Sequence, residues 1–445
     1  MIGGWLSLLP NPYTLNPNMS SFRISDHLKH SLQSNTTALF KWLFLSIFIG
    51  IVVGFIGIAF HFSLEYVTEL RKNYPWLLLL MPIAGLIIVA LYHFSGMDDD
   101  TGTESVITSV RNGALVRLRM APLVFVSTVL THLTGGSAGR EGAALQLGGS
   151  ISSAIGRWLK LDDRDQRVIT MCGMATGFSA LFGTPLAAAV FAMEVETVGV
   201  MYYAALVPCF LGALTARQVA GYFNASGTFF NILNIPTIPT AQNTISLILL
   251  GVACGILANL FCRFLEFFNH LYKKRFPNRW IRVVIGSITV IFVSIMVRTN
   301  AYNGAGIWVI DQAMQGTAEP LAFFYKMLLT ALTLNAGFKG GEIVPSFFVG
   351  ATFGCFIAPV IGLEASFAAG VGLVCVFCGV TNAPMTSILL SYELFGGKGV
   401  QLMALAIAVS YMTSGYHSLY HSQKIAYSKT KAKYIDVFSD DNIDE

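Results

Sequence analysis

Long runs of apolar residues dominate the chain, and short polar segments separate them. Stretches with few charges occur at 39–69, 75–97, 119–134, 168–193, 197–216, 244–272, 281–297, 319–338, 343–363, 366–392 and 400–418. A helix of about 20 apolar residues spans a bilayer, so the longer stretches predict transmembrane helices. Several others are short or contain Gly and Pro, which predicts half-spanning or re-entrant helices. We therefore expect an all-α, polytopic membrane protein.

The composition supports this class. Hydrophobic residues make up 54% of the 445 positions and charged residues only 12%, with a mean hydropathy of +0.63. Soluble domains of this length carry about twice that share of charged residues. The formal net charge of +4 is modest and gives no reason to expect a nucleic-acid partner. The lipid bilayer of a cell membrane is the expected environment.

Basic residues gather in two polar segments, and their positions predict which ends of the helices face the cytoplasm. They are Lys273, Lys274, Arg275, Arg279 and Arg282 in one loop, and Lys424, Lys429, Lys431 and Lys433 near the C-terminus. Cytoplasmic loops carry an excess of Lys and Arg, so both segments are expected in the cytoplasm. The first residues have no basic region and contain Pro10 and Pro12, which does not indicate a cleaved signal peptide. Met19 is an alternative start.

The two halves of the chain share a weak similarity at a spacing of about 200 residues. A Pro-to-Glu distance of nine residues occurs in both halves, and so does a Gly-to-Gly distance: Pro185 to Glu194, Pro384 to Glu393, Gly139 to Gly148 and Gly341 to Gly350. Matched pairs in the same order predict an internal duplication. We divide the chain into an N-terminal cytoplasmic segment (1–37), repeat one (38–225), an extended linker (226–239), repeat two (240–425) and a C-terminal tail (426–445).

A charged pair, Arg140 and Glu141, lies inside the Gly-rich segment GGSAGREGAALQLG, between two apolar stretches. A charge at mid-bilayer costs about 2.5–3.5 kcal/mol and usually faces a cavity or an ion path. Transporters built from repeats place broken helices at the repeat interface, where helix N-termini bind anions. Glycines that merely allow close helix packing are the alternative. Because such motifs occur at matching places in both halves, we favour an anion site, with Glu141 as its first candidate.

These motifs resemble those of the CLC chloride channel and transporter family. GGSAGREGAALQLGG is similar to the GREGP-type motif of that family, and GGEIVPSFFVGATFG occupies the place of its GxFxP-type motif. The first family motif, usually GSGxP, would fall on residues 102–106 and matches poorly. The resemblance covers residues 38–425. It implies an inverted-repeat fold, chloride or fluoride as the transported ion, no cofactor, and a homodimer with one pathway per subunit.

The resemblance also implies roles for single residues. In the family the Glu of the GREG motif is the gate, which blocks the anion path when ionised and leaves it when protonated; here it is Glu141. The implied anion contacts are Gly139, Arg140, Gly142, the backbone amides of Ile343 and Val344, Tyr420 and the region of Thr103.

Departures from the common pattern bear on the subtype. Val195 follows Glu194 where the chloride-antiporting branch has a second, inner Glu. Glu342 stands where the common branch has a bulky apolar residue, which resembles the fluoride/proton antiporter branch. That branch usually has Thr at the position of Val344, so chloride and fluoride both stay open. Antiport and a passive channel also stay open, and Glu141 with Glu342, as two candidate proton carriers, favours antiport.

Other polar residues suggest weaker alternatives. Residues 135–139 match GxSxG, the motif of a serine hydrolase with Ser137 as nucleophile, but that motif requires a preceding strand and a helix-like run precedes it here. The eight histidines are dispersed without HExxH, so we expect neither an enzyme nor a metal site. Lys326 is expected to snorkel, and Asp98 to Asp100 to form a solvated turn. Glu194 and Glu393 are expected to cap helices or to conduct protons, and Glu65 and Glu266 to be interfacial.

Overall fold

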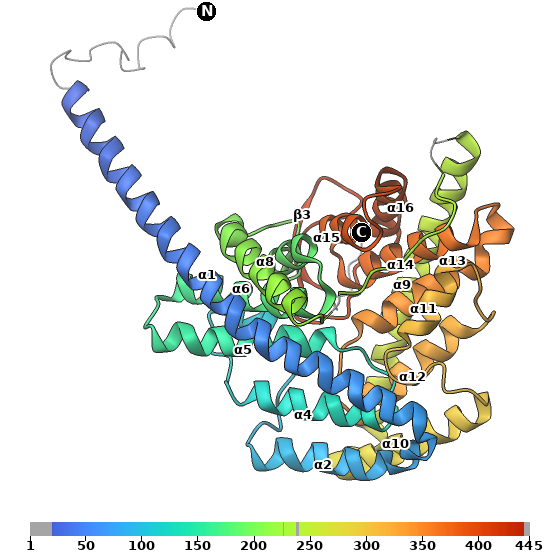
Figure 1. Cartoon of the computed structure of the whole chain (residues 1–445). Helices are drawn as coiled ribbons and strands as arrows, with labels where there is room; N and C mark the ends of the chain where they lie inside the picture. Colours follow the sequence, from blue (N-terminus) through green and yellow to red (C-terminus); the bar gives the residue numbers. More distant parts are fainter. Residues whose placement is uncertain (1–19, 226, 237–239, 440–445) are drawn as a thin grey trace, which may run out of the picture. The chain divides into compact units, whose positions relative to one another are not determined.

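A computed structural model describes residues 20–225, 227–236 and 240–439, so Met19 lies outside the described residues. The first half contains α1 (Ser20–Asn73), the 3-10 helix η1 (Pro75–Leu80), α2 (Met81–Phe94), α3 (Thr103–Asn112), α4 (Met120–Leu133), α5 (Glu141–Trp158), α6 (Asp163–Phe182), α7 (Pro185–Glu194), the 3-10 helix η2 (Tyr203–Ala205) and α8 (Leu206–Tyr222). The second half contains α9 (Ala241–Arg275), α10 (Arg279–Val297), α11 (Ile307–Met314), α12 (Ala322–Ala336), α13 (Ile343–Ile361), α14 (Ala365–Thr381), α15 (Pro384–Leu394) and α16 (Val400–Thr413) (Figure 1). All side-chain contacts discussed below lie within the compact unit Ser46–Glu445.

The described chain contains both long and short apolar helices, as expected of a multi-pass membrane protein. Six segments of the described chain are long and apolar enough to cross a membrane: Thr36–Asn73, Pro75–Phe94, Tyr203–Tyr222, Ala241–Arg275, Arg279–Val297 and Ile343–Ile361. Shorter apolar helices of 10–17 residues include α4, α7, α12, α14 and α16. These helices confirm the predicted helical membrane architecture, in which some apolar helices are too short to span a bilayer.

Two of the apolar stretches are broken helices, and the breaks correspond between the halves. The stretch 168–193 is divided at Gly183, whose left-handed φ of 72° ends α6, and Pro185 begins α7. The stretch 366–392 is divided in the same way at Asn382, with a φ of 54°, and Pro384 begins α15. A left-handed residue ends a helix, and Pro suits the first turn of the next because its missing N–H is not needed there.

The helices after these breaks cap each other across the two halves. Glu194, at the end of α7, accepts hydrogen bonds from the backbone N–H groups of Met385 and Thr386 at the start of α15. Glu393, near the end of α15, accepts from those of Leu186 and Ala187 at the start of α7. Because each helix has its C-terminal end at the N-terminus of the other, α7 and α15 run antiparallel. Capping is therefore the observed contact of both glutamates.

Glycines allow the closest helix contacts in both halves. A Cβ atom at Gly148 in α5 would lie 1.9 Å from the carbonyl oxygen of Gly173 in α6. A Cβ atom at Gly350 in α13 would lie 2.3 Å from the carbonyl oxygen of Gly372 in α14. Such distances exclude any side chain, so close packing explains the second glycine of each matched spacing. The first glycine of each spacing, Gly139 or Gly341, instead lies just before a helix N-terminus.

A small sheet near the C-terminus was not part of the all-α prediction. Strand β1 (Thr197–Val198) pairs in parallel with β2 (Lys424–Tyr427), which pairs antiparallel with β3 (Tyr434–Phe438). The Gln423 side chain reinforces the sheet by donating to the carbonyl oxygens of Val195 and Thr381. The C-terminal segment is thereby fixed beside the ends of α7 and α14, just after Tyr420.

Candidate anion pathway

The two Gly-rich motifs meet in space. Gly139 and Gly341 form an isolated antiparallel bridge, in which each backbone N–H donates to the carbonyl oxygen of the other, at 2.7 and 2.9 Å. A Cβ atom at Gly139 would lie 2.3 Å from Oε2 of Glu141 and 3.1 Å from the carbonyl oxygen of Gly341, so a side chain here would require the Glu141 carboxylate to move. Helix α5 begins two residues after one glycine and α13 two residues after the other. The predicted convergence of the two helix N-termini is confirmed.

The carboxylate of Glu141 occupies this meeting point. Its Oε2 accepts hydrogen bonds from the backbone N–H groups of Arg140, at 2.9 Å, and Val344, at 3.3 Å. Its Oε1 has no hydrogen-bond partner among the described residues, and the Arg140 Nε lies 3.9 Å away. The side chain is fully buried. A carboxylate from the first half thus lies at the N-terminus of a helix of the second half, where unpaired N–H groups attract anions.

Two cavities approach this point. The first, of about 950 Å³, is lined by charged and polar residues that include His61, Arg71, His132, Arg140 and Asn303. The second, of about 460 Å³, is lined by Thr103, Gln146, Gly340, Glu342 and Tyr420 among others. Arg140 belongs to the first lining and Gly340 to the second, while Glu141 belongs to neither. We call the first cavity the outer cavity and the second the inner cavity.

The cavities lie at opposite ends of a membrane-length helix. Helix α10 begins at Arg279, which lines the inner cavity, and ends two residues before Thr299, which lines the outer cavity. Its 19 residues rise about 28 Å, close to the hydrocarbon thickness of a bilayer. Lys273 and Arg282, from the loop predicted to be cytoplasmic, also line the inner cavity.

The inner cavity brings together most of the remaining site residues expected from the sequence. Gln146 donates through Nε2 to the Thr103 hydroxyl at 3.1 Å, and this hydroxyl lies 3.4 Å from the Gly142 carbonyl oxygen. Tyr420 is 2% exposed, and its hydroxyl has no hydrogen-bond partner among the described residues. Glu342 is half-buried at the N-cap of α13 and faces the same cavity.

The loop that carries Tyr420 is held in place from both sides. Glu104 accepts a hydrogen bond from the backbone N–H of His421 at 2.8 Å. Ser439, just after β3, donates its hydroxyl to the carbonyl oxygen of Tyr420 at 3.0 Å. Arg111 donates to the carbonyl oxygen of Ser422. The C-terminal sheet and α3 together position the tyrosine ring.

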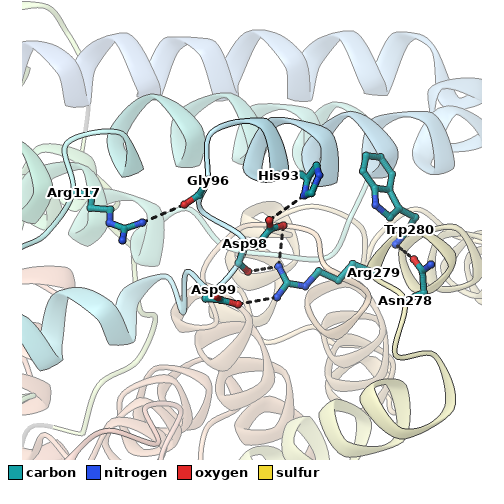
Figure 2. Close-up of polar contacts among 8 residues, drawn as sticks. All are labelled: His93, Gly96, Asp98, Asp99, Arg117, Asn278, Arg279 and Trp280. Carbon is teal, nitrogen blue, oxygen red and sulfur yellow. Dashed lines mark hydrogen bonds and ion pairs between the residues drawn. The ribbon is translucent and has the colours of Figure 1, made fainter.

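An ion-paired cluster joins Asp98 and Asp99 to Arg279, and all three residues line the inner cavity (Figure 2). Arg279 pairs with Asp98 at 3.1 Å and with Asp99 at 3.2 Å, and His93 bonds to Asp98 at 3.0 Å. The predicted solvated turn at Asp98 to Asp100 is thus also a contact between the loop before α3 and the start of α10. Exposed pairs of this kind stabilise a fold by no more than about 1 kcal/mol.

Two other polar side chains have partners that sequence reasoning did not foresee. The hydroxyl of Ser137 bonds to that of Thr330 in α12, at 3.0 Å. No histidine contacts Ser137 among the hydrogen bonds of the described residues, and His132 bonds instead to the Thr128 carbonyl oxygen. Lys326 is fully buried, and its Nζ donates to the carbonyl oxygens of the loop after α10, so the expectation that it snorkels is wrong.

Some residues around the site were missed by sequence reasoning. Gln146 had a detectable signal, because it is a polar residue inside an otherwise small and apolar helical stretch that begins at Glu141. Glu104 and His61 had no such signal, because their partners are distant in sequence. Glu104 contacts the backbone N–H of His421, and His61 contacts the side chain of Arg140.

Comparison with known proteins identifies the family. Residues 84–415 match the family model described as voltage gated chloride channel. A chloride/fluoride channel protein of Pseudomonas syringae pv. tomato is 34% identical over 396 residues, which cover 87% of each chain. An H(+)/Cl(-) exchange transporter ClcA of Vibrio campbellii is 23% identical over 81% of this chain and 83% of its own length.

Solved structures agree with the helical architecture. The crystal structure of a CLC-type fluoride/proton antiporter superimposes with a TM-score of 0.84 and 31% identity, covering 87% of this chain and 98% of that one. The structure of a slow cyanobacterial Cl-/H+ antiporter superimposes with a TM-score of 0.73 at 20% identity, over 84% of this chain and 94% of that one, which shows a common fold. From the family match, the identity over most of its length and the shared fold, we conclude that the chain belongs to the voltage-gated chloride channel (CLC) family.

Proposed function

We propose that this protein exchanges a halide ion for protons across the membrane, with Glu141 as the gate. The observation that carries the proposal is the hydrogen bond from the Val344 N–H to Oε2 of Glu141. In that position the carboxylate uses a donor at the N-terminus of α13 that a halide would also use. The side chain is fully buried between two cavities, so anion passage requires that it move.

Protonation supplies the reason for it to move. An ionised carboxylate is an anion and is attracted by helix N-termini, whereas a protonated carboxyl loses this attraction and accepts hydrogen bonds less strongly. The freed N–H groups of Arg140 and Val344 are then available to a halide. Each protonation of Glu141 is thereby linked to the passage of an anion, which is the requirement for exchange.

The remaining anion contacts come from both helix starts and from the inner cavity. We assign the anion path to Gly139, Arg140 and Gly142 at the start of α5, to the backbone amides of Ile343 and Val344, and to Thr103 and Tyr420. The support is that the bridge of Gly139 and Gly341 joins the two helix starts. Thr103 and Tyr420 line the inner cavity together with Gly340, which precedes Gly341 of the bridge. The Tyr420 hydroxyl has a hydrogen to donate and no acceptor among the described residues.

Glu342 is our candidate for proton handling on the inner side. Val195 occupies the position at which the chloride-antiporting branch has its inner Glu, so a different residue must serve. Glu342 directly follows Gly341 of the bridge and faces the inner cavity, which connects it to water. A proton that reaches Glu342 from the cytoplasmic side is then close to the anion site.

Fluoride is the favoured substrate and chloride the alternative. Fluoride is smaller and more tightly hydrated than chloride, so it requires strong donors, and a protonated Glu342 offers one. A chloride/fluoride channel protein and a CLC-type fluoride/proton antiporter, at 34% and 31% identity, support this preference. A passive channel is the second candidate function, because a continuous anion path alone would suffice for it.

Reconstitution into liposomes tests these alternatives. Chloride and fluoride efflux are recorded with ion-selective electrodes while the internal pH is followed with a dye. Exchange predicts that halide efflux drives proton uptake against a pH gradient, and a channel predicts efflux without it. Vesicles that pass neither ion would contradict the proposed function.

Ser137→Ala tests the hydrolase alternative, because undiminished halide flux in this variant excludes a nucleophilic role of Ser137 in transport.

We also propose a homodimer of two complete pathways, each built from repeats 38–225 and 240–425 joined by the linker 226–239. The support is membership of the family, whose resemblance implies a homodimer with one pathway per subunit. Light scattering of the detergent-solubilised protein should give twice the subunit mass of 48.3 kDa. A monomeric mass at concentrations that retain transport would contradict the dimer.

A further inference from the structure

A relay of polar contacts continues from the gate into the outer cavity. Arg140 Nη1 lies 3.1 Å from Nδ1 of His61, in the outer part of α1. Nε2 of the same ring lies 3.9 Å from a carboxylate oxygen of Glu65, one helical turn further along. All three side chains line the outer cavity. The order is therefore Glu65, His61, Arg140 and Glu141, from an exposed carboxylate to a buried one.

The contact between Arg140 and His61 fixes the state of the imidazole. A guanidinium group only donates hydrogen bonds, so Nδ1 of His61 must be the acceptor. The ring is then neutral and carries its hydrogen on Nε2, which faces Glu65. In this arrangement Arg140 is bound to His61, while its Nε stays 3.9 Å from Oε1 of Glu141, an oxygen without a hydrogen-bond partner among the described residues.

Protonation of His61 would reverse this arrangement. Both ring nitrogens of an imidazolium carry hydrogen, so Nδ1 can no longer accept from Arg140, and the two cations repel each other. The free oxygen of Glu141, 3.9 Å from the Arg140 Nε, is then an acceptor within reach of the guanidinium. A hydrogen bond from Arg140 to that oxygen would hold the carboxylate in the anion path.

We propose that His61 is a positioning residue that acts as a brake on the gate. Neutral His61 keeps Arg140 away from Glu141, and protonated His61 releases Arg140 to hold Glu141 in place. The inference rests on the proposed function of Glu141. Acid in the outer cavity then has two opposed effects: protonation of Glu141 opens the path, and protonation of His61 delays that opening.

Charged groups from two helices face the His61 ring. Glu65, 67% exposed, faces it from its own helix, and Arg140 faces it from the start of α5. The other titratable or charged groups in the lining of the outer cavity are Glu69, Arg71, Lys72, His132 and Asp311. Arg71 is bound to the carbonyl oxygen of His132 and not to His61.

The variant His61→Asn separates holding from titration. An amide oxygen accepts a hydrogen bond from Arg140 as Nδ1 does, but the amide does not protonate. Halide efflux is measured with the same pH on both sides of the vesicles, from about 7.5 to about 5.5, a range that brackets the ordinary titration of imidazole. We expect rates within about twofold of the unmodified protein at the upper pH, and at least about threefold higher rates at the lower pH, where protonation of His61 would engage the brake in the unmodified protein alone.

The control variant is His270→Asn. His270 also lies one helical turn from a glutamate, with Nε2 3.7 Å from Glu266, but it forms no hydrogen bond with an arginine among those of the described residues. Its pH profile should match that of the unmodified protein. His61→Gln, which also retains an amide acceptor, replaces His61→Asn if the latter does not reach the membrane.

The background Glu141→Gln shows whether His61 acts through the gate. In that background the added substitution His61→Asn should leave the pH profile unchanged, because there is no carboxylate for Arg140 to hold. An equal effect in both backgrounds, or an unchanged or flatter profile of His61→Asn by itself, would overturn the inference. Absence of halide flux in the unmodified protein would instead overturn the proposed function.

Discussion

Glu141 and Glu194 both place a carboxylate at a helix N-terminus of the other half of the chain, but they do so differently. Both oxygens of Glu194 are bonded: Oε1 accepts from the Met385 N–H at 3.0 Å, and Oε2 accepts from the N–H and the hydroxyl of Thr386 at 2.8 and 2.6 Å. Glu393 is held in the same way by two N–H groups at 2.9 Å. Glu141 uses only one oxygen, and its bond to Val344 is long, at 3.3 Å.

The difference lies in how firmly each carboxylate is held at its helix N-terminus. A hydrogen bond to a charged group contributes about 1.5–3 kcal/mol, so a carboxylate with every oxygen bonded is costly to move or to protonate. A carboxylate with a free oxygen can take up a proton there without first breaking a bond. Glu194 and Glu393 thus join the two halves, whereas Glu141 keeps one oxygen at which a proton can bind.

The largest expected effect is on proton coupling. Glu141→Gln resembles the protonated gate, so halide flux should persist or rise while its pH dependence and proton uptake disappear. Halide efflux and internal pH are recorded together in liposomes. Glu194→Gln is the matched control and should retain coupling, because its carboxylate has a capping contact. Pumping of protons by a folded Glu141→Gln variant would show that Glu141 is not the gate.

The second effect is on stability. Glu194→Ala leaves the N–H groups of Met385 and Thr386 without their acceptor, which should lower the free energy of unfolding by about 2–4 kcal/mol. The thermal midpoint of the detergent-solubilised protein measures this loss, and Glu393→Ala should behave alike. Glu65→Ala, at an exposed position, serves as the control with little change. Equal midpoints for Glu194→Ala and the unmodified protein would refute the structural role of the cap.

A third effect concerns the choice of ion. Glu342→Ala removes the donor that we assign to fluoride, so fluoride flux should fall about tenfold, the equivalent of one hydrogen bond to a charged species, and chloride flux should fall less. Both fluxes are compared in the same vesicle preparation. Glu266→Ala is the control, because the Glu266 carboxylate pairs with His270 and His417 and does not belong to the described lining of either cavity. Chloride flux without fluoride flux in the unmodified protein would contradict the fluoride preference and assign the protein to the chloride-transporting branch.

The smallest effect is expected for the tyrosine in the inner cavity. Tyr420→Phe removes one neutral hydroxyl donor, worth about 1 kcal/mol, so halide affinity should fall about fivefold without loss of coupling. Isothermal titration of the purified protein with halide measures it. Tyr416→Phe is the matched control, because the Tyr416 hydroxyl bonds to Ser428 in the tail. Unchanged affinity in Tyr420→Phe would place the anion elsewhere in the cavity.

The sequence by itself determined the class, the family and the local backbone. Apolar length predicted a helical membrane protein because transfer into lipid depends on composition over about 20 residues. Pro185 and Pro384 begin helices because backbone sterics act within one turn. The matched nine-residue spacings and the GREG and GEIVP segments predicted two helix starts at a common place, which the bridge between Gly139 and Gly341 confirms.

Only the tertiary structure decided which partner each polar group has. The donor from Val344 to Glu141 lies 203 residues away, and the caps of Glu194 and Glu393 cross between the halves in the same way. Lys326 illustrates the limit of local rules: its length predicts snorkelling, but the loop after α10 brings carbonyl oxygens to its buried ammonium. Such contacts follow from the packing of whole helices against each other, and neither local hydropathy nor residue spacing contains that information.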